Sequence, residues 1–259
     1  MTAVPHHTAL DEVRLSEQKD GVVVLTVNRP PANALSNALV ARLATTIGDL
    51  ARRADAPALV LTGAGDRFFT AGGDVKEAVG YGVEAMVERM TAFHALLGAF
   101  EHYPRPLVCA VNGWCVGGGI EMTLFADAVY ASTDARFVFP EINHGLLPAV
   151  KGIPRARRLL GDRAARRLLL GGEPIDAYDA ENLGIVDLVV PPDEVLTAAV
   201  AHARGAAAKP PVVYAELKRT LADRTEGWSD EEQLTATAAG ARTVFEDPTA
   251  RAAREGWNG

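Results

Sequence analysis

One segment limits the possible folds more than any other. In residues 111–127, VNGWCVGGGIEMTLFAD, an apolar strand pattern runs through three consecutive glycines into an apolar helix pattern. The first N–H groups of a helix have no partners within it, and the helix dipole adds partial positive charge there. Glycines let a ligand oxygen approach this backbone closely. The segment predicts either a site that stabilises a developing oxyanion or a tight corner that needs glycine only for packing, and local physics favours neither.

The rest of the chain alternates strand and helix patterns. Residues 12–18 and 22–28 predict a hairpin across Asp20-Gly21, and Ser36 predicts the cap of a helix that runs to about Arg53. Further strands are expected at 58–62, 106–111, 129–131, 136–139 and 186–190, and further helices at 84–100, at 120–126 and over most of the chain after 155. This order predicts an α/β domain with a C-terminal helical region.

Charge and cysteine content narrow the class of protein. The 259 residues include 26 Lys and Arg and 33 Asp and Glu, a net charge of −7, whereas nucleic-acid binding needs a basic surface. The first ten residues lack the apolar stretch of an export signal, and polar residues interrupt the longest apolar run. Cys109 and Cys115, the two cysteines, suit a reducing compartment and are expected to be buried. We therefore expect a cytoplasmic protein that binds neither nucleic acid nor membrane.

Two glutamates are candidates for acid–base chemistry. Glu121 follows the three glycines in the first turn of an apolar helix, where it either stabilises the helix terminus or points into a site as a general acid or base. Glu141 follows Pro140 in FVFPEINHG and, considered alone, is more typical of a surface loop. If the two carboxylates converge on one substrate, they form an acid–base pair.

A second glycine-rich loop lies in residues 68–77, FFTAGGDVKE. Its Gly73 could offer another backbone N–H to a ligand. Asp74 is expected to cap the helix that follows. No metal site is expected, because the six histidines show no metal-ligand spacing.

These motifs together resemble the enoyl-CoA hydratase/isomerase family, also called the crotonase superfamily. The matching stretches are NRPPANAL at 28–35, LTGAGDRFFTAGGDVKE at 61–77, VNGWCVGGGIE at 111–121, FPEINHGLLP at 139–148 and GIVDLVVPPDEV at 184–195. The resemblance implies a crotonase-like spiral of ββα turns over residues 1–200, with a C-terminal helical oligomerisation region over 201–259. It also implies a homotrimer or homohexamer that acts on an acyl-CoA thioester, with coenzyme A entering as part of the substrate and no other cofactor.

The resemblance also implies the site residues. The backbone N–H groups of Gly73 and Gly118 form the oxyanion hole, and Glu121 and Glu141 hold and activate a water that adds to a 2-enoyl-CoA. Glu121 is carried over as the base toward water and Glu141 as the donor of a proton to C2. The other residues expected to contact the substrate are Ala32, Ala34, Leu35, Ala71, Asp74, Val75, Lys76, Trp114 and Gly117. Trp114 could equally pack in the core, and Lys76 could be an ordinary exposed lysine rather than a contact to CoA phosphate.

Other functions stay open at this point. An enzyme of the same family could isomerise, decarboxylate or hydrolyse an acyl-CoA, or act as a hydratase-lyase, although the hydroxycinnamoyl-CoA hydratase-lyases use a C-terminal tyrosine and the last tyrosine here is Tyr214. A non-catalytic RNA-binding or scaffold relative would need a lysine-rich early helix. Residues 36–53 carry only Arg42, Arg52 and Arg53 as basic residues, which disfavours that alternative. Hydration is the favoured hypothesis because both glutamates of the family's hydratases are matched, by Glu121 and Glu141.

Overall fold

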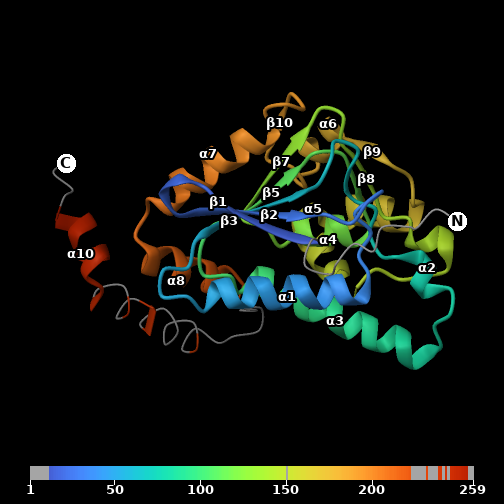
Figure 1. Ribbon diagram of the computed structural model, residues 1–259, viewed down its shortest axis with the longest axis horizontal. Coiled ribbons are helices and arrows are strands. Elements are labelled where there is room, and N and C mark those ends of the chain that lie inside the picture. Colours follow the sequence, from blue (N-terminus) through green and yellow to red (C-terminus); the bar gives the residue numbers. More distant parts are fainter. Residues whose placement is uncertain are drawn as a thin grey trace, which may run out of the picture.

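The computed structural model describes residues 12–149, 151–222, 232, 239–240, 243 and 246–255, and its strands form two sheets (Figure 1). The first sheet has the order β1-β2-β3-β5-β7-β10 and is parallel except for the antiparallel β1–β2 hairpin. Its strands are β1 Val13–Glu17, β2 Val22–Val27, β3 Ala58–Gly63, β5 Leu107–Val111, β7 Ala128–Ser132 and β10 Leu188–Val190. The second sheet contains β4 Phe68–Thr70, β6 Trp114–Val116, β8 Arg136–Val138 and β9 Ile175–Asp176, in that order.

Helices connect and cover these strands. Those before residue 150 are α1 Asn37–Ala51, α2 Val75–Ala78, α3 Val83–Glu101 and α4 Gly118–Thr123. Those after it are α5 Gly152–Gly171, interrupted at Gly161, α6 Ala177–Asn182, α7 Val195–Ala207, α8 Pro211–Ala222 and α10 Pro248–Glu255. Short 3-10 turns occur at Lys19–Gly21 and Glu141–His144. The predicted hairpin is confirmed, as is the cap of α1, where the Ser36 hydroxyl accepts the Leu39 N–H at 3.1 Å.

A repeating unit organises the two sheets. Three times, one strand enters the first sheet, the next enters the second sheet, and helical structure follows: β3 and β4 precede α2 and α3, β5 and β6 precede α4, and β7 and β8 precede the Glu141–His144 turn and α5. This is the predicted spiral of ββα turns. Because β4, β6 and β8 pair in parallel, their carboxyl ends meet at one edge of the second sheet.

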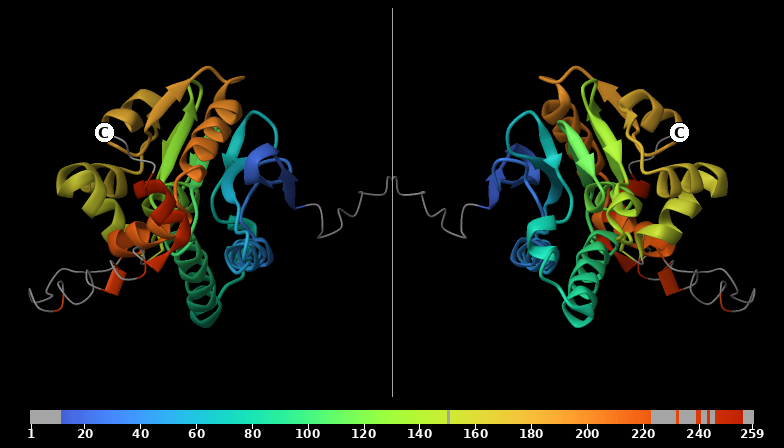
Figure 2. Two further views of the ribbon diagram at one scale, coloured as in Figure 1. Left: turned by 90° about the vertical axis from the view of Figure 1, so that its left-hand side faces the viewer. Right: turned by 90° about the vertical axis from the view of Figure 1, so that its right-hand side faces the viewer.

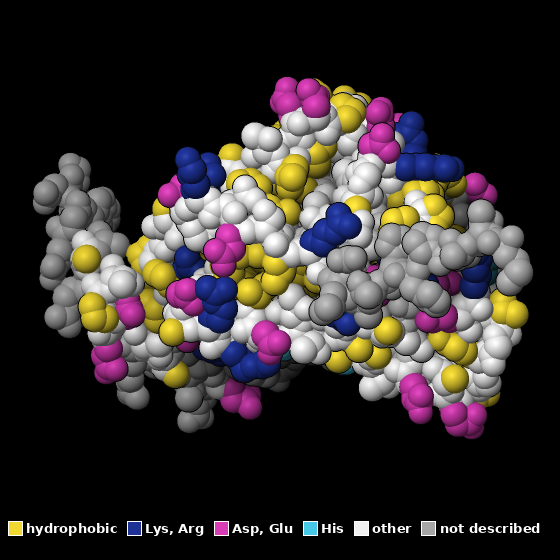
Figure 3. Space-filling model, viewed as in Figure 1, with side chains coloured by type: hydrophobic (Ala, Val, Ile, Leu, Met, Phe, Trp, Pro, Cys, Tyr) yellow, Lys and Arg dark blue, Asp and Glu magenta, His cyan; other side chains and the backbone are white. Residues whose placement is uncertain are grey.

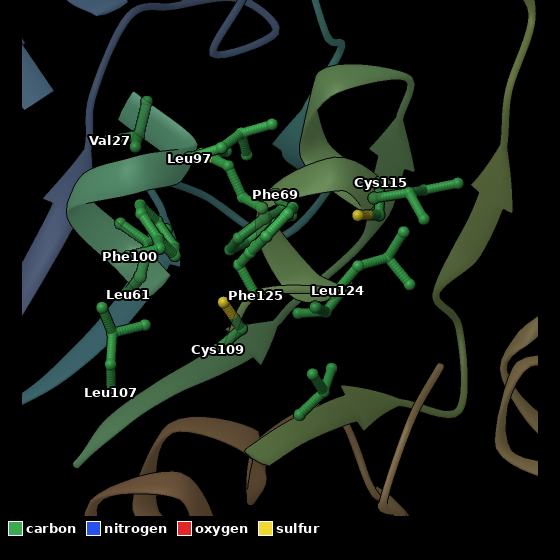
Figure 4. Close-up of a cluster of buried hydrophobic side chains, with 14 of the residues drawn as sticks. Val27, Leu61, Phe69, Leu97, Phe100, Leu107, Cys109, Cys115, Leu124 and Phe125 are labelled. Carbon is green, nitrogen blue, oxygen red and sulfur yellow. The ribbon is translucent and has the colours of Figure 1, made fainter. Parts of the chain in front are cut away.

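The central strands β2, β3, β5 and β7 of the first sheet are buried on both faces, as expected for parallel strands, whereas the edge strand β1 is largely exposed. Alternate residues of its strands point to opposite sides. Leu25, Leu61 and Cys109 belong to a core packed against α1 and α3, which lie side by side (Figures 1, 2 and 4). Val24 and Val60 face the other way, into a smaller cluster closed by α7. Cys109 and Cys115 are both buried and unpaired, as predicted.

Two sequence expectations need correction. Residues 68–70 are expected to belong to a loop but form β4, and residues 114–116, for which no separate strand is expected, form β6, because pairing within the second sheet stabilises strands of only three residues. The helix expected at 120–126 begins two residues earlier and ends at Thr123. The expected division at residue 200 stays a prediction; that residue lies in α7, whose Ala199 and Ala203 pack against the first sheet. Much of the expected oligomerisation region lies outside the described residues, so its role stays a prediction.

Two further observations concern the expectations about nucleic-acid binding and membrane binding. Acidic and basic side chains are interspersed over the face shown in Figure 3. In the part of the chain that the structure describes, no helix combines the length and the apolar character needed to cross a bilayer.

Candidate active site

A cavity lies beyond the carboxyl ends of β4, β6 and β8. Each strand leads into one wall: β4 into the loop at Gly73, β6 into the glycines before α4, and β8 into the turn that begins at Glu141. Helix α3 contributes an apolar wall through Met86, Met90 and Phe93. The cavity therefore brings together three segments that are separated by 20 residues or more in the sequence.

The backbone of Gly73 is oriented by a parallel bridge to Leu35. The Leu35 N–H donates to Gly72 O at 2.8 Å, and the Asp74 N–H donates to Leu35 O at 3.0 Å. In such a bridge the N–H of the central residue points away from its partner. The Gly73 N–H therefore turns from Leu35 toward the cavity that Gly73 lines. Asp74 caps α2 as predicted, because its carboxylate accepts the Lys76 N–H at 3.0 Å.

The second donor comes from the start of α4. Gly118 is the first residue of this helix and lines the cavity, so its N–H has no acceptor within the helix. The preceding residue, Gly117, has a φ of 49°, a conformation that favours glycine. A side chain at Gly117 would run into the Glu141 carboxylate, and one at Gly118 would run into the Phe93 ring. Glycine at both positions therefore leaves space for Glu141 and Phe93 in the cavity wall, and Gly117 also allows the chain to turn into α4.

Glu121 projects from α4 into the cavity and is 2% exposed. Burial raises its pKa to about 8, and the negative charge of Glu141 adds to the rise, while the backbone N–H of Ala149 opposes it with a hydrogen bond. The Oε1 atom of Glu121 is buried and accepts no hydrogen bond from the described residues. Gly152 leaves room for this oxygen, because a side chain there would occupy its place.

Glu141 reaches the same cavity from the turn after β8. Burial raises its pKa above the usual value, against the effect of a hydrogen bond from its own backbone N–H. Its Oε2 atom is also buried without a hydrogen-bond donor among the described residues. The surface-loop alternative for Glu141 is therefore wrong, because its side chain faces inward although its backbone belongs to a turn.

The two unsatisfied carboxylate oxygens define what the site can do. A buried oxygen that accepts no hydrogen bond lowers the stability of the fold unless a ligand or water donates one to it. Carboxylates with raised pKa values can carry a proton near neutral pH, so the pair can accept one proton and deliver another. Two backbone N–H groups on the cavity wall can stabilise negative charge that develops on a substrate oxygen.

The structure divides the expected substrate contacts into two groups. Ala71, Asp74, Val75 and Gly117 line the cavity together with the four expected catalytic residues. The remaining expected contacts lie outside its lining: Ala32, Ala34, Leu35, Lys76 and Trp114. Trp114 lies in β6, in register with Phe68 of β4 and Arg136 of β8, and outside the cavity lining.

Several lining residues were not among the sequence candidates. Met86, Met90 and Phe93 share one face of α3, and Arg89, His144 and Leu147 also line the cavity. The spacing of the first three predicts a helix face but cannot show that it borders a cavity rather than the core. Among the described residues, no three side chains of the metal-binding types come together.

Comparisons with known proteins agree with this geometry. A family model described as enoyl-CoA hydratase/isomerase matches residues 17–258. The 2,3-dehydroadipyl-CoA hydratase of Escherichia coli is 35% identical over 232 residues, which cover 87% of this chain and 89% of that protein. The short-chain-enoyl-CoA hydratase of Clostridium acetobutylicum is 32% identical over 206 residues, 79% of each protein.

Solved structures show the same architecture. An enoyl-CoA hydratase from Bacillus anthracis matches with a TM-score of 0.86 at 27% identity and covers 92% of each chain. An enoyl-CoA hydratase from Mycobacterium smegmatis matches with a TM-score of 0.84 at 30% identity, covering 92% of this chain and 93% of that one. The predicted crotonase-like fold is thus confirmed, and the chain belongs to the enoyl-CoA hydratase/isomerase family.

Proposed function

We propose that this protein is an enoyl-CoA hydratase, which adds water across the double bond of a 2-enoyl-CoA thioester. The observation that carries the proposal is the pair of buried, unsatisfied oxygens on Glu121 and Glu141 in one cavity. An isomerase needs to move one proton between two carbons and can use one carboxyl group. Hydration needs a base for water and an acid for carbon, which this pair supplies.

The proposed reaction begins with polarisation of the thioester. The N–H groups of Gly73 and Gly118 donate to the carbonyl oxygen and draw electron density from C3. A water molecule held by the two glutamates forms a bond from its oxygen to C3 while its proton passes to the ionised carboxylate. The neutral carboxyl group then delivers its proton to C2 of the enolate. The product is a 3-hydroxyacyl-CoA, and the pair ends with one proton, as it began.

The two glutamates are treated as one titrating pair. Burial raises both pKa values, and the charge of Glu141 adds to the rise for Glu121, so the pair retains a proton near neutral pH. By analogy with the family, we assign Glu121 as the base and Glu141 as the acid. As the base, Glu121 must be the ionised member of the pair. The bound water must therefore donate a hydrogen bond to Glu121, because a hydrogen bond to the charged form of a carboxyl group lowers its pKa.

The wall formed by α3 supports an acyl substrate. Met86, Met90 and Phe93 line the same cavity as the carboxylates with apolar surface, and Leu146 and Leu147 add apolar lining from the segment after the Glu141–His144 turn. Apolar walls with a few placed polar groups are typical of small-molecule sites. The Escherichia coli and Clostridium acetobutylicum relatives are both named as hydratases, which supports the same reaction here.

The test is direct assay of the purified chain with a 2-enoyl-CoA such as crotonyl-CoA. Loss of the absorbance of the conjugated thioester, with a product heavier by one water molecule, is the expected result. A matched saturated thioester serves as the control for hydrolysis and should remain unchanged. A product that has lost carbon dioxide, a shifted double bond without added water, or release of free CoA would replace hydration by another reaction of the family.

A further inference from the structure

We propose that Arg89 is a positioning residue for the oxyanion hole: its guanidinium holds the Gly73 backbone and places a positive charge behind the Gly73 N–H. The inference rests on the proposed function only in naming the reaction that benefits. The new point is that polarisation of the thioester depends on the side chain of Arg89, which lies on α3, outside the glycine loops.

Arg89 lies at the cavity wall on α3, and its side chain is 11% exposed. Its Nη2 donates to Leu35 O at 3.1 Å, and its Nη1 donates to Asn37 Oδ1 at 2.7 Å. Leu35 O is the same carbonyl that accepts the Asp74 N–H in the bridge around Gly73. The guanidinium therefore contacts the strand segment that sets the direction of the Gly73 N–H.

The guanidinium also packs directly on Gly73. A Cβ built at Gly73 would collide with Arg89 Nη2, so the glycine lets the charged group come within contact distance of the backbone. The guanidinium thus contacts the same residue, Gly73, whose N–H would bind the substrate oxygen. A positive charge held at this residue favours an enolate over a neutral thioester, and an interaction of this kind raises kcat.

A small polar network keeps the arginine in place. Glu77 Oε2 lies 3.7 Å from Arg89 Nη1 and accepts the Asn37 N–H at 2.9 Å, and the Asn37 side chain donates to Tyr81 OH at 2.8 Å. These contacts join the start of α1, helix α2 and helix α3 beside the oxyanion loop. They use the two ends of the arginine fork, which a lysine cannot reproduce.

Arg29 holds the same loop from another direction and clarifies the special role of Arg89. Arg29 bonds Asp74 at 2.7 Å and Ala34 O at 3.0 Å, but it is not part of the cavity lining. Both arginines fix the loop, whereas Arg89 alone of the two also faces the cavity. Its loss should therefore change carbonyl polarisation as well as loop stability.

The experiment uses Arg89→Met, Arg89→Lys and the matched control Arg105→Gln. Arg105 is likewise half-buried and donates to a backbone carbonyl, that of Ala207 at 3.1 Å, away from the catalytic cavity. The first readout is binding of a 4-dimethylaminocinnamoyl-CoA probe, whose absorbance moves to longer wavelength when its carbonyl is polarised. This readout does not require that the protein add water.

We expect the wild-type chain and Arg105→Gln to shift the probe absorbance to longer wavelength. Arg89→Met should bind the probe with little of this shift, and Arg89→Lys should give an intermediate shift. With crotonyl-CoA, Arg89→Met should lower kcat about 10- to 100-fold with KM nearly unchanged, less than loss of a whole oxyanion donor. A full shift in folded Arg89→Met, or a loss confined to KM, would overturn the proposal. Absence of hydration by a wild-type chain that still shifts the probe would instead reject the hydratase proposal alone.

Discussion

The catalytic cavity and the region around Asp127 both hold carboxylates, but the cavity buries one unpaired oxygen of each glutamate, whereas the Asp127 carboxylate is partly exposed and paired. Asp127 directly precedes β7. Its Oδ2 accepts hydrogen bonds from the Lys218 ammonium group at 2.7 Å and from the Leu107 N–H at 2.8 Å. Glu121 and Glu141 each keep a buried oxygen that no described residue satisfies. Asp127 thus links α8 to the sheet, whereas the glutamates retain the capacity to bind and transfer protons at a cost in stability.

The largest expected effect comes from removing either cavity carboxylate. We expect Glu121→Gln and Glu141→Gln each to lower kcat for hydration about 10²- to 10⁴-fold, because glutamine can neither accept nor deliver the proton. Loss of crotonyl-CoA absorbance measures the rate, and calorimetric titration with a saturated acyl-CoA should show nearly unchanged binding. Undiminished hydration by either folded variant would contradict the proposed pair.

The second effect concerns the paired carboxylate. Lys218→Met should remove the ion pair to Asp127 and lower the free energy of unfolding by about 1 kcal/mol, since the Asp127 side chain is 21% exposed and water can solvate it when the lysine is gone. Denaturant unfolding measures this change. Lys218→Met with Asp127→Leu is the matched double variant and should recover part of the loss. If the single variant is as stable as the wild type, the pair does not hold α8.

The third effect concerns how the free energy of unfolding depends on pH. Glu121 should contribute less stability as the pH rises, whereas a salt-bridged acid contributes more. The raised pKa of Glu121, about 8, means that the folded state binds its proton more tightly than the unfolded chain does. This contribution to stability is complete below the ordinary carboxyl pKa and is lost as pH rises through about 8. Glu121→Gln should therefore gain stability relative to wild type as the pH is raised from 5 to 9, because glutamine has no proton to lose. Parallel stability profiles for the two chains would contradict the raised pKa.

The smallest effect distinguishes two helical glycines. Gly205 in α7 has open space where a side chain would go, so Gly205→Ala should raise the free energy of unfolding by about 0.5–1 kcal/mol and leave turnover unchanged. Gly152→Ala places its methyl group on the Glu121 carboxylate and should lower turnover. Thermal unfolding and the hydration assay on the same samples test both. Equal turnover in the two variants would show that Gly152 does not make room for Glu121.

The sequence alone predicted much of this protein. The leucines of α1 repeat at helix spacing and are buried, Ser36 and Asp74 cap the helices they precede, and the glycines before α4 predicted a wall of the site. Such features depend on neighbours within a few residues. The resemblance carried by the glycine loops extended them to the spiral fold and to the pairing of Glu121 with Glu141.

Only the tertiary structure decided which residues surround the substrate space. Strands β4 and β6 are too short for a sequence pattern, and they exist because each pairs with the next along the second sheet. Arg89 meets Leu35 across 54 positions of the chain, and no local periodicity signals that contact. Local propensities are set by nearest neighbours, whereas the cavity is formed where strand ends distant in sequence are brought together by burial of both faces of the sheet.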